Sequence, residues 1–134
     1  MDSINIKPET IKEVIMEQTH GALFHDEKIN LDLECLDCIE TNINLSVPWY
    51  LMASYAYYEQ DDPILSDAMY DRLAKKILAH WGEIKHMHKH HLSVDMLEAG
   101  SYIGTYPSRV AGGLRSLKET YYGKDYVRTH SRST

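Results

Sequence analysis

Residues 57–73 read YYEQDDPILSDAMYDRL and predict a helix, a break and a second helix within one short stretch. Pro63 disfavours helical backbone at the preceding Asp62, so the first helix is expected to end before it. Ser66 or Asp67 then provides a cap for the second helix. Beyond the cap, apolar side chains recur at helical spacings of three and four, namely Tyr70, Leu73, Ile77 and Trp81. The stretch therefore predicts a helix–turn–helix core.

The flanking sequence adds further helices to this core. Residues 27–35 differ, since apolar and polar side chains alternate there with the period of a half-buried strand. Residues 22–25 are the candidate partner of that strand in a small β-hairpin. We therefore expect a mainly α, compact helical domain whose one sheet element is a hairpin near the N-terminus. The first helix of the core is predicted at 44–60, and the other helices at 7–21, 93–100 and 108–123.

The composition is that of one globular domain. The chain has 134 residues, of which 43% are hydrophobic and 25% charged, and this length can bury a core without disulfides. No apolar run approaches the roughly 18 residues that would span a bilayer, and the polar N-terminus does not resemble a secretory signal. Two cysteines favour a reducing setting. We expect a cytoplasmic protein without membrane contact.

Charge divides the single predicted domain, 1–134, into three segments. Residues 1–41, an acidic N-terminal extension, hold 3 basic and 10 acidic side chains. The helical core, 42–108, holds 5 basic and 8 acidic side chains. The basic C-terminal helix and polar tail, 109–134, hold 6 basic and 2 acidic side chains. The acidic front argues against non-specific nucleic-acid binding, which requires a positive face. The basic end is a candidate contact for a phosphate or an acidic partner, or simply a solvated surface.

The tyrosines and aspartates of residues 57–73 have two interpretations. In the first, Tyr57, Tyr58 and Tyr70 pack between helices, and the aspartates only favour the positive end of a helix. In the second, Asp67 and Asp71, one helical turn apart, lie beside the aromatic faces. Such a set binds a planar, cationic ring and the hydroxyls of a ribose, which is the chemistry of a nicotinamide ribonucleotide among other ligands.

This stretch resembles the signature of the small N-terminal domain, called Ia, of NAD-dependent DNA ligases. The similarity runs from Tyr57-Tyr58 through Asp61, Pro63 and Asp67 to Tyr70-Asp71-Arg72-Leu73, about 17 residues well and about 35 loosely. In that family the domain closes over the nicotinamide mononucleotide half of NAD while a lysine of the next domain attacks the adenylyl phosphorus. The resemblance implies a set of nucleotide-binding residues, Tyr57, Tyr58, Asp67, Tyr70 and Asp71, with NMN or NAD as ligand.

The chain also departs from the ligases. It has no Lys-x-Asp-Gly motif of an adenylation domain, so we expect no ligase activity and no catalytic residue. Glu59 stands where the family has an apolar residue, and Met69 where it has glutamate. Residues 47–54, VPWYLMAS, are unusually apolar, which predicts a helix that the N-terminal extension, a partner protein or a second copy covers through its surface around Trp49–Tyr55.

Three functions follow from these patterns. The first hypothesis is a stand-alone, non-catalytic Ia-like domain that acts as an interaction or inhibitory module, of the kind that phages and mobile elements encode, with a retained or vestigial nucleotide pocket. The alternative is a protein that binds NMN or NAD, sensing or sequestering it, or that completes a separately encoded adenylation domain. The third, an unrelated enzyme that uses the histidine cluster, ranks behind both.

Two other clusters carry weaker signals. Five histidines lie within twelve positions, and two of them share a helical spacing, but a metal site requires three or four converging ligands. A solvated, pH-responsive surface is therefore expected rather than a metal site. Cys35 and Cys38 are interpreted as small core residues, because the acidic side chains around them disfavour a reactive thiolate. The histidines are His80, His86, His88, His90 and His91.

Overall fold

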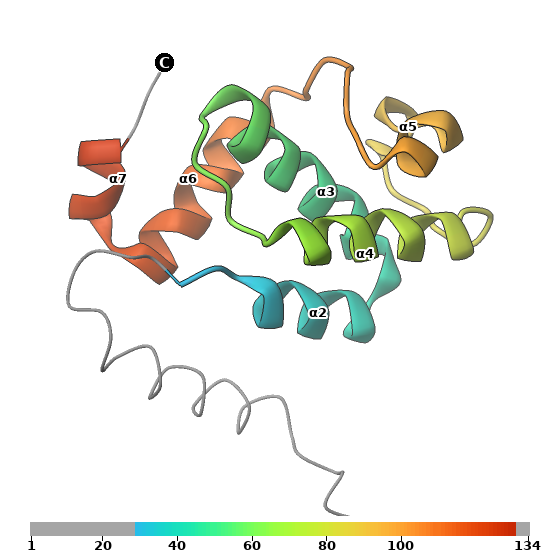
Figure 1. Ribbon diagram of the computed structural model, residues 1–134, viewed down its shortest axis with the longest axis horizontal. Coiled ribbons are helices and arrows are strands. Elements are labelled where there is room, and N and C mark those ends of the chain that lie inside the picture. Colours follow the sequence, from blue (N-terminus) through green and yellow to red (C-terminus); the bar gives the residue numbers. More distant parts are fainter. Residues whose placement is uncertain (1–28, 131–134) are drawn as a thin grey trace, which may run out of the picture.

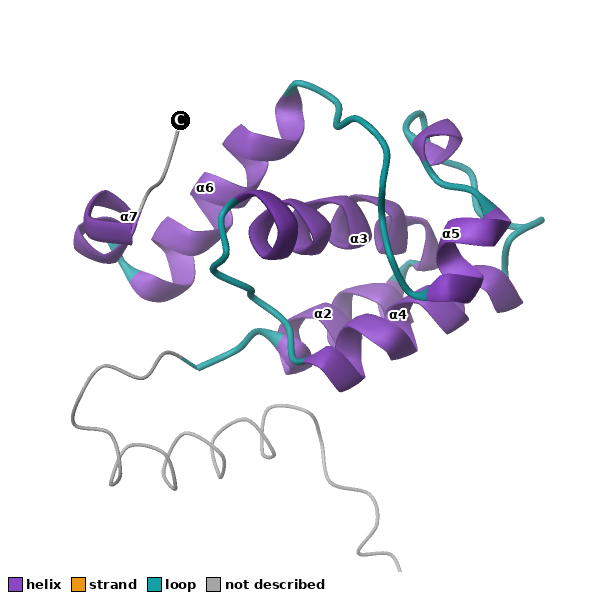
Figure 2. Cartoon of the chain, turned by 45° about the horizontal axis from the view of Figure 1, so that its top comes forward, coloured by secondary structure: helices purple, strands orange, loops and turns teal. Residues whose placement is uncertain are grey.

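The computed structural model describes residues 29–130, which fold into helices joined by loops, with no strand among them (Figure 2). The predicted mainly α class is confirmed. The predicted helix at 7–21 and the strand at 22–25 lie outside the described residues. No helix within 29–130 is long and apolar enough to cross a membrane. The α-helices are α2 (Asp32–Thr41), α3 (Ser46–Ser54), α4 (Asp67–Ala79), α5 (Val94–Ala99), α6 (Arg109–Tyr122) and α7 (Lys124–His130).

Helix α3 is the centre of the fold, with α2, α4 and α6 packed around it (Figure 1). Val47, Tyr50 and Leu51 have no exposed surface, and Trp49 is buried as well. A helix that is apolar on every side is buried on every side. The chain itself supplies much of the predicted cover of this apolar helix, because α2, which belongs to the predicted N-terminal extension, packs against it together with α4 and α6. Contact with a partner protein or a second copy around Trp49–Tyr55 stays a prediction.

The predicted strand at 27–35 is wrong over its described part, which opens α2. The side-chain oxygen of Asn30 accepts a hydrogen bond from the Asp32 N–H at 3.2 Å, a local turn that starts the helix. Leu31, Cys35 and Ile39 are all buried in the core. These three residues are four positions apart, the spacing of one helix face, and this period overrides the alternation that suggested a strand.

Helix α4 begins with a double cap. The Ser66 hydroxyl accepts a hydrogen bond from the Met69 N–H at 3.0 Å, so Ser66 rather than Asp67 is the N-cap. The Asp32 carboxylate in turn accepts hydrogen bonds from the Ser66 N–H at 2.9 Å and from the Ser66 hydroxyl at 2.6 Å. The first turn of α2 is thereby joined to the start of α4.

The remaining helices follow the predicted order. Ser93 caps α5, and Gly100 ends it with φ at +66°, the left-handed conformation that glycine adopts without strain. Helix α6 forms despite two consecutive glycines, and a Cβ at Gly113 would lie 3.6 Å from the Met52 sulfur of α3, an ordinary contact distance. The polar tail after 123 departs from expectation, because Lys124–His130 forms helix α7 and buries Val127.

The core joins all three charge segments. Ile39 comes from the predicted N-terminal extension, Leu73 from the predicted core and Leu114 from the predicted C-terminal segment, and all three belong to one buried cluster. The boundary drawn at 41 and 42 therefore separates two helices, α2 and α3, that share a single core.

Candidate functional site

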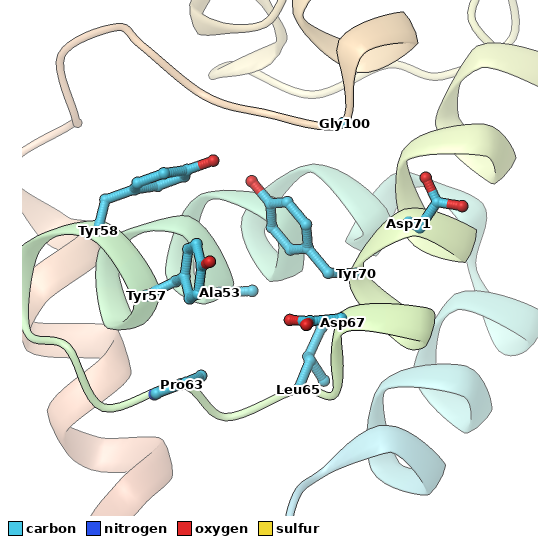
Figure 3. Close-up of a pocket in the computed structure, with 9 residues that line it drawn as sticks. All are labelled: Ala53, Tyr57, Tyr58, Pro63, Leu65, Asp67, Tyr70, Asp71 and Gly100. Carbon is cyan, nitrogen blue, oxygen red and sulfur yellow. The ribbon is translucent and has the colours of Figure 1, made fainter.

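A cavity of about 200 Å³ opens between the end of α3, the 60–66 turn and the start of α4, with α5 at its rim (Figure 3). All five residues of the predicted binding set line it. Three further side chains and one glycine were not in that set. The lining consists of Ala53, Tyr57, Tyr58, Pro63, Leu65, Asp67, Tyr70, Asp71 and Gly100.

Two exposed tyrosines form the outer wall. Tyr57 and Tyr58 lie in η3 (Tyr55–Glu59), a π-helix that continues α3 and closes with a hydrogen bond from the Gln60 N–H to the Tyr55 carbonyl at 3.1 Å. Single π-turns of this kind often mark functional sites. The two rings meet edge to face at 4.8 Å and keep 46% and 44% of their surface exposed. Both therefore offer an aromatic face to a ligand.

Tyr70 of α4 forms the back wall. Its ring stacks on the buried Tyr50 ring with centroids 4.7 Å apart and 16° between the planes. Its hydroxyl lies 2.6 Å from the Ser54 hydroxyl. Burial raises the pKa of Tyr70 to about 12, while the hydrogen bond with Ser54 acts in the opposite direction. The Tyr70 side chain is thus a neutral hydroxyl held in place by α3.

The two aspartates make the cavity acidic. Asp67 points its carboxylate into the cavity, whereas Asp71 lies at the edge, where a Cβ on Gly100 would come within 3.5 Å of its oxygen (Figure 3). Asp71 also forms an exposed ion pair with Lys75 at 3.1 Å. No lysine, arginine or histidine of residues 29–130 lines the cavity. The site therefore favours a cation or a group that donates hydrogen bonds.

The sequence signalled some of the additional lining residues and missed others. Pro63 and Leu65 lie within the stretch that carried the prediction, and Ala53 is one helical turn before Tyr57. Gly100 lies about thirty positions away, and its place at the rim depends on how α5 packs against α4. A packing contact of this kind has no signal in the local sequence.

The histidine cluster lies apart from this cavity. The His90 and His91 rings contact each other at 4.3 Å, and the His86 and His88 rings at 5.5 Å. Burial, and next the nearby His88, lower the pKa of His86. Nδ1 of His91 lies 3.1 Å from the Thr105 carbonyl oxygen. Within 29–130 no group of three or more acidic, histidine or cysteine side chains is arranged to hold a metal ion.

The cysteines differ in exposure. Cys35 is fully buried in α2 and Cys38 half-buried, and both are free thiols. Burial above all, with smaller contributions from Cys38 and Asp32, raises the pKa of the Cys35 thiol far above its usual value. Since the thiolate is the reactive form, Cys35 is a core residue.

Comparison of the chain with protein-family models, with curated proteins and with solved structures finds no match. The likeness to the ligase Ia domain therefore depends on the motif of residues 57–73.

Proposed function

We propose that this chain binds nicotinamide mononucleotide, free or as one half of NAD, in the cavity beside Tyr57 and Tyr70. The observation that carries the proposal is the convergence of five residues on one opening. Tyr57, Tyr58, Asp67, Tyr70 and Asp71 come from a π-helix and a separate α-helix, yet all of them line the same cavity. These are the residues that the ligase-like motif assigns to nucleotide binding.

The ring spacing defines where nicotinamide can stack. The Tyr57 and Tyr70 centroids lie 6.4 Å apart with 33° between the planes. A ring inserted between them would need roughly 7–8 Å, twice the contact distance of carbon atoms. The nicotinamide ring therefore stacks on an outer, exposed face of Tyr57 or Tyr58, and Tyr70 supports that wall from behind.

Charge and size favour the mononucleotide half. The oxidised nicotinamide ring is a cation, so the tyrosine faces and the carboxylates both attract it, and ribose hydroxyls can donate to Asp67 or Asp71. The cavity, about 200 Å³, is smaller than the ~300–1,000 Å³ typical of sites for drug-sized ligands. A phosphate gains nothing from the acidic lining. In this proposal the phosphate, and the adenylate half of NAD, extend out of the cavity.

The proposed role is binding and orientation of the nucleotide, as a sensor, a store or the nucleotide-binding partner of an adenylation domain. The rival hypothesis of an interaction or inhibitory module rests on the apolar helix, on the acidic N-terminal segment and on the missing adenylation motif. Since α3 is buried within the chain, the first of these three supports is weakened.

Calorimetric titration tests the proposal with NMN, NAD and AMP as ligands. We expect heat with NMN and NAD, and none with AMP. Tyr57→Ala should weaken NMN binding by about 1–3 kcal/mol, the usual contribution of one stacked ring. Tyr121→Ala is the matched control, since Tyr121 is a tyrosine of α6 that is also 46% exposed and does not line the cavity. Absence of heat with millimolar NMN, or an equal loss in both variants, would contradict the proposal.

A further inference from the structure

Helix α6 carries a buried lysine that contacts the turn beside the cavity. The Lys118 side chain is only 6% exposed, and lysine is almost never buried unless it is paired. Its ammonium donates to the Gln60 side-chain oxygen at 2.8 Å, to an Asp62 carboxylate oxygen at 2.8 Å and to the Asp62 carbonyl at 3.3 Å. Three acceptors on one short turn thus converge on a single cation more than fifty positions away.

Helix α7 contacts the same carboxylate. The Tyr126 hydroxyl donates to the two Asp62 oxygens at 2.9 and 3.2 Å. Asp62 is itself only 16% exposed, and these partners replace water around its carboxylate. We call this arrangement of Lys118 and Tyr126 around Asp62 the C-terminal clasp. In Figure 1, α6 and α7 lie on the side of α3 from which this turn departs.

The clasped turn connects two walls of the cavity. Tyr58 precedes it and Pro63 follows it, and both residues line the cavity, whereas Gln60, Asp61 and Asp62 do not. Asp61 adopts φ of +54°, a left-handed conformation that is uncommon for a residue other than glycine. Such backbone persists where the surrounding structure holds it. The contacts of the clasp on either side of Asp61 supply that restraint.

We propose that the C-terminal clasp is a positioning device for the cavity, in which Lys118 and Tyr126 hold the 60–62 turn and thereby set Tyr57 and Tyr58 against Tyr70. Its residues on α6 and α7 lie outside the 17 residues that carry the ligase-like motif. Where ligand affinity is concerned, the inference rests on the proposed nucleotide binding. Because such coupling is reciprocal, a ligand that binds only when Tyr57 and Tyr58 are in place also stabilises the packing of α6 and α7 against the turn.

The test compares variants of one helix. Lys118→Met removes the ammonium and keeps the length of the side chain, and Lys118→Arg keeps the charge. Leu114→Ala is the control, because Leu114 is fully buried one turn before Lys118 on α6 and takes no part in the hydrogen bonds of the clasp. Tyr126→Phe is the milder variant, which loses only the hydroxyl. Readouts are NMN affinity, melting temperature and NMR signals of ring-labelled Tyr57 and Tyr58.

We expect Lys118→Met to weaken NMN binding about tenfold, within the ~5–150-fold range of coupled sites, and to shift or broaden the Tyr57 and Tyr58 signals. Tyr126→Phe should shift the same signals less, and Lys118→Arg should preserve most of the affinity. Leu114→Ala should lower the melting temperature with affinity within twofold of the unsubstituted protein.

Two results would overturn the inference. One is unchanged tyrosine signals in folded Lys118→Met and Tyr126→Phe, and the other is an equal loss of affinity in Leu114→Ala. If no variant, nor the unsubstituted protein, binds NMN, the proposed function fails, and the tyrosine signals alone decide whether the clasp positions the cavity.

Discussion

The Ser54 and Tyr70 hydroxyls lie 2.6 Å apart at the back of the cavity, and this contact ties the last residue of α3 to the first turn of α4. Ser54 also donates to the Tyr50 carbonyl at 2.7 Å. The same hydroxyl therefore links a helix end, the stacked Tyr50–Tyr70 pair and the wall of the cavity. The outer tyrosines thus have a hydrogen-bonded and stacked layer behind them.

Removing only this hydroxyl should be mildly destabilising. Tyr70→Phe keeps the ring stacked on Tyr50 and leaves Ser54 with its carbonyl partner, so no buried polar group is left without a hydrogen bond. We expect the free energy of unfolding to fall by about 1 kcal/mol, measured by urea denaturation. Tyr121→Phe, on an exposed part of α6, should change it by less than about 0.5 kcal/mol. A Tyr70→Phe variant as stable as the parent would show that the contact contributes nothing.

Alkaline pH should destabilise the fold through its buried phenols. Burial is the main cause that raises the pKa of Tyr70 to about 12, and it raises those of four further tyrosines higher still, namely Tyr50, Tyr106, Tyr122 and Tyr126. Above the ordinary value of 10 the unfolded chain loses these protons while the folded chain keeps them. The folded state then binds more protons, so stability must fall as pH rises.

The contribution of these phenols to the free energy of unfolding is thus fully present below pH 10, and it decreases from pH 10 to 12 and beyond. Urea denaturation at a series of pH values measures this slope, and phenolate absorbance follows the ionisation. Tyr70→Phe should reduce the slope, since it removes one of the shifted groups. Stability that stays constant through this window would contradict the raised pKa values of these tyrosines.

The double cap of α4 should show energetic coupling between Asp32 and Ser66. Each of Asp32→Ala and Ser66→Ala removes a capping acceptor, and we expect each to cost about 1–2 kcal/mol. The double variant should cost less than the sum of the two, because both changes break the hydrogen bonds that the residues share. Strict additivity in this double-mutant cycle would mean that α2 and α4 are joined by other contacts.

The sequence predicted those elements whose signals are local. Ser66 and Ser93 stand three positions before a backbone N–H that they cap, and Gly100 ends α5, so α4 and α5 were predicted from caps and spacing. Residues 29–35 were misassigned because a period of two and a spacing of four coincide in Leu31 and Cys35. Only Ile39, beyond the alternating run, distinguishes the helix from the strand.

The sequence predicted five of the residues that line the cavity, but not the contacts that hold them in place. One short turn joins the two segments that carry the five residues of the motif, and so brings these residues together. The π-helix that orients Tyr57 and Tyr58, in contrast, has no sequence signature. The contact between Lys118 and Asp62 spans 56 positions, and composition showed only a basic segment. Long-range ion pairs depend on how helices pack, which a local pattern does not contain.

The acidic cavity should distinguish the oxidised from the reduced nicotinamide ring. Oxidised NMN carries a cationic ring and its reduced form a neutral one, so both the carboxylates and the tyrosine faces favour the oxidised ligand. Asp67 should contribute more than Asp71, because Lys75 already lies 3.1 Å from the Asp71 carboxylate. A charge about 5 Å away, partly screened by water, contributes about 1 kcal/mol.

Asp67→Asn should therefore weaken the binding of oxidised NMN by about 1 kcal/mol more than the binding of reduced NMN, as measured by calorimetric titration of both ligands. Asp95→Asn is the matched control. Asp95 lies in the first turn of α5, as Asp67 lies in the first turn of α4, and the substitution removes the same charge outside the cavity. The difference should shrink at high salt, which screens exposed charges. Equal losses for the two ring states, or for the two variants, would mean that the Asp67 carboxylate does not face the ring.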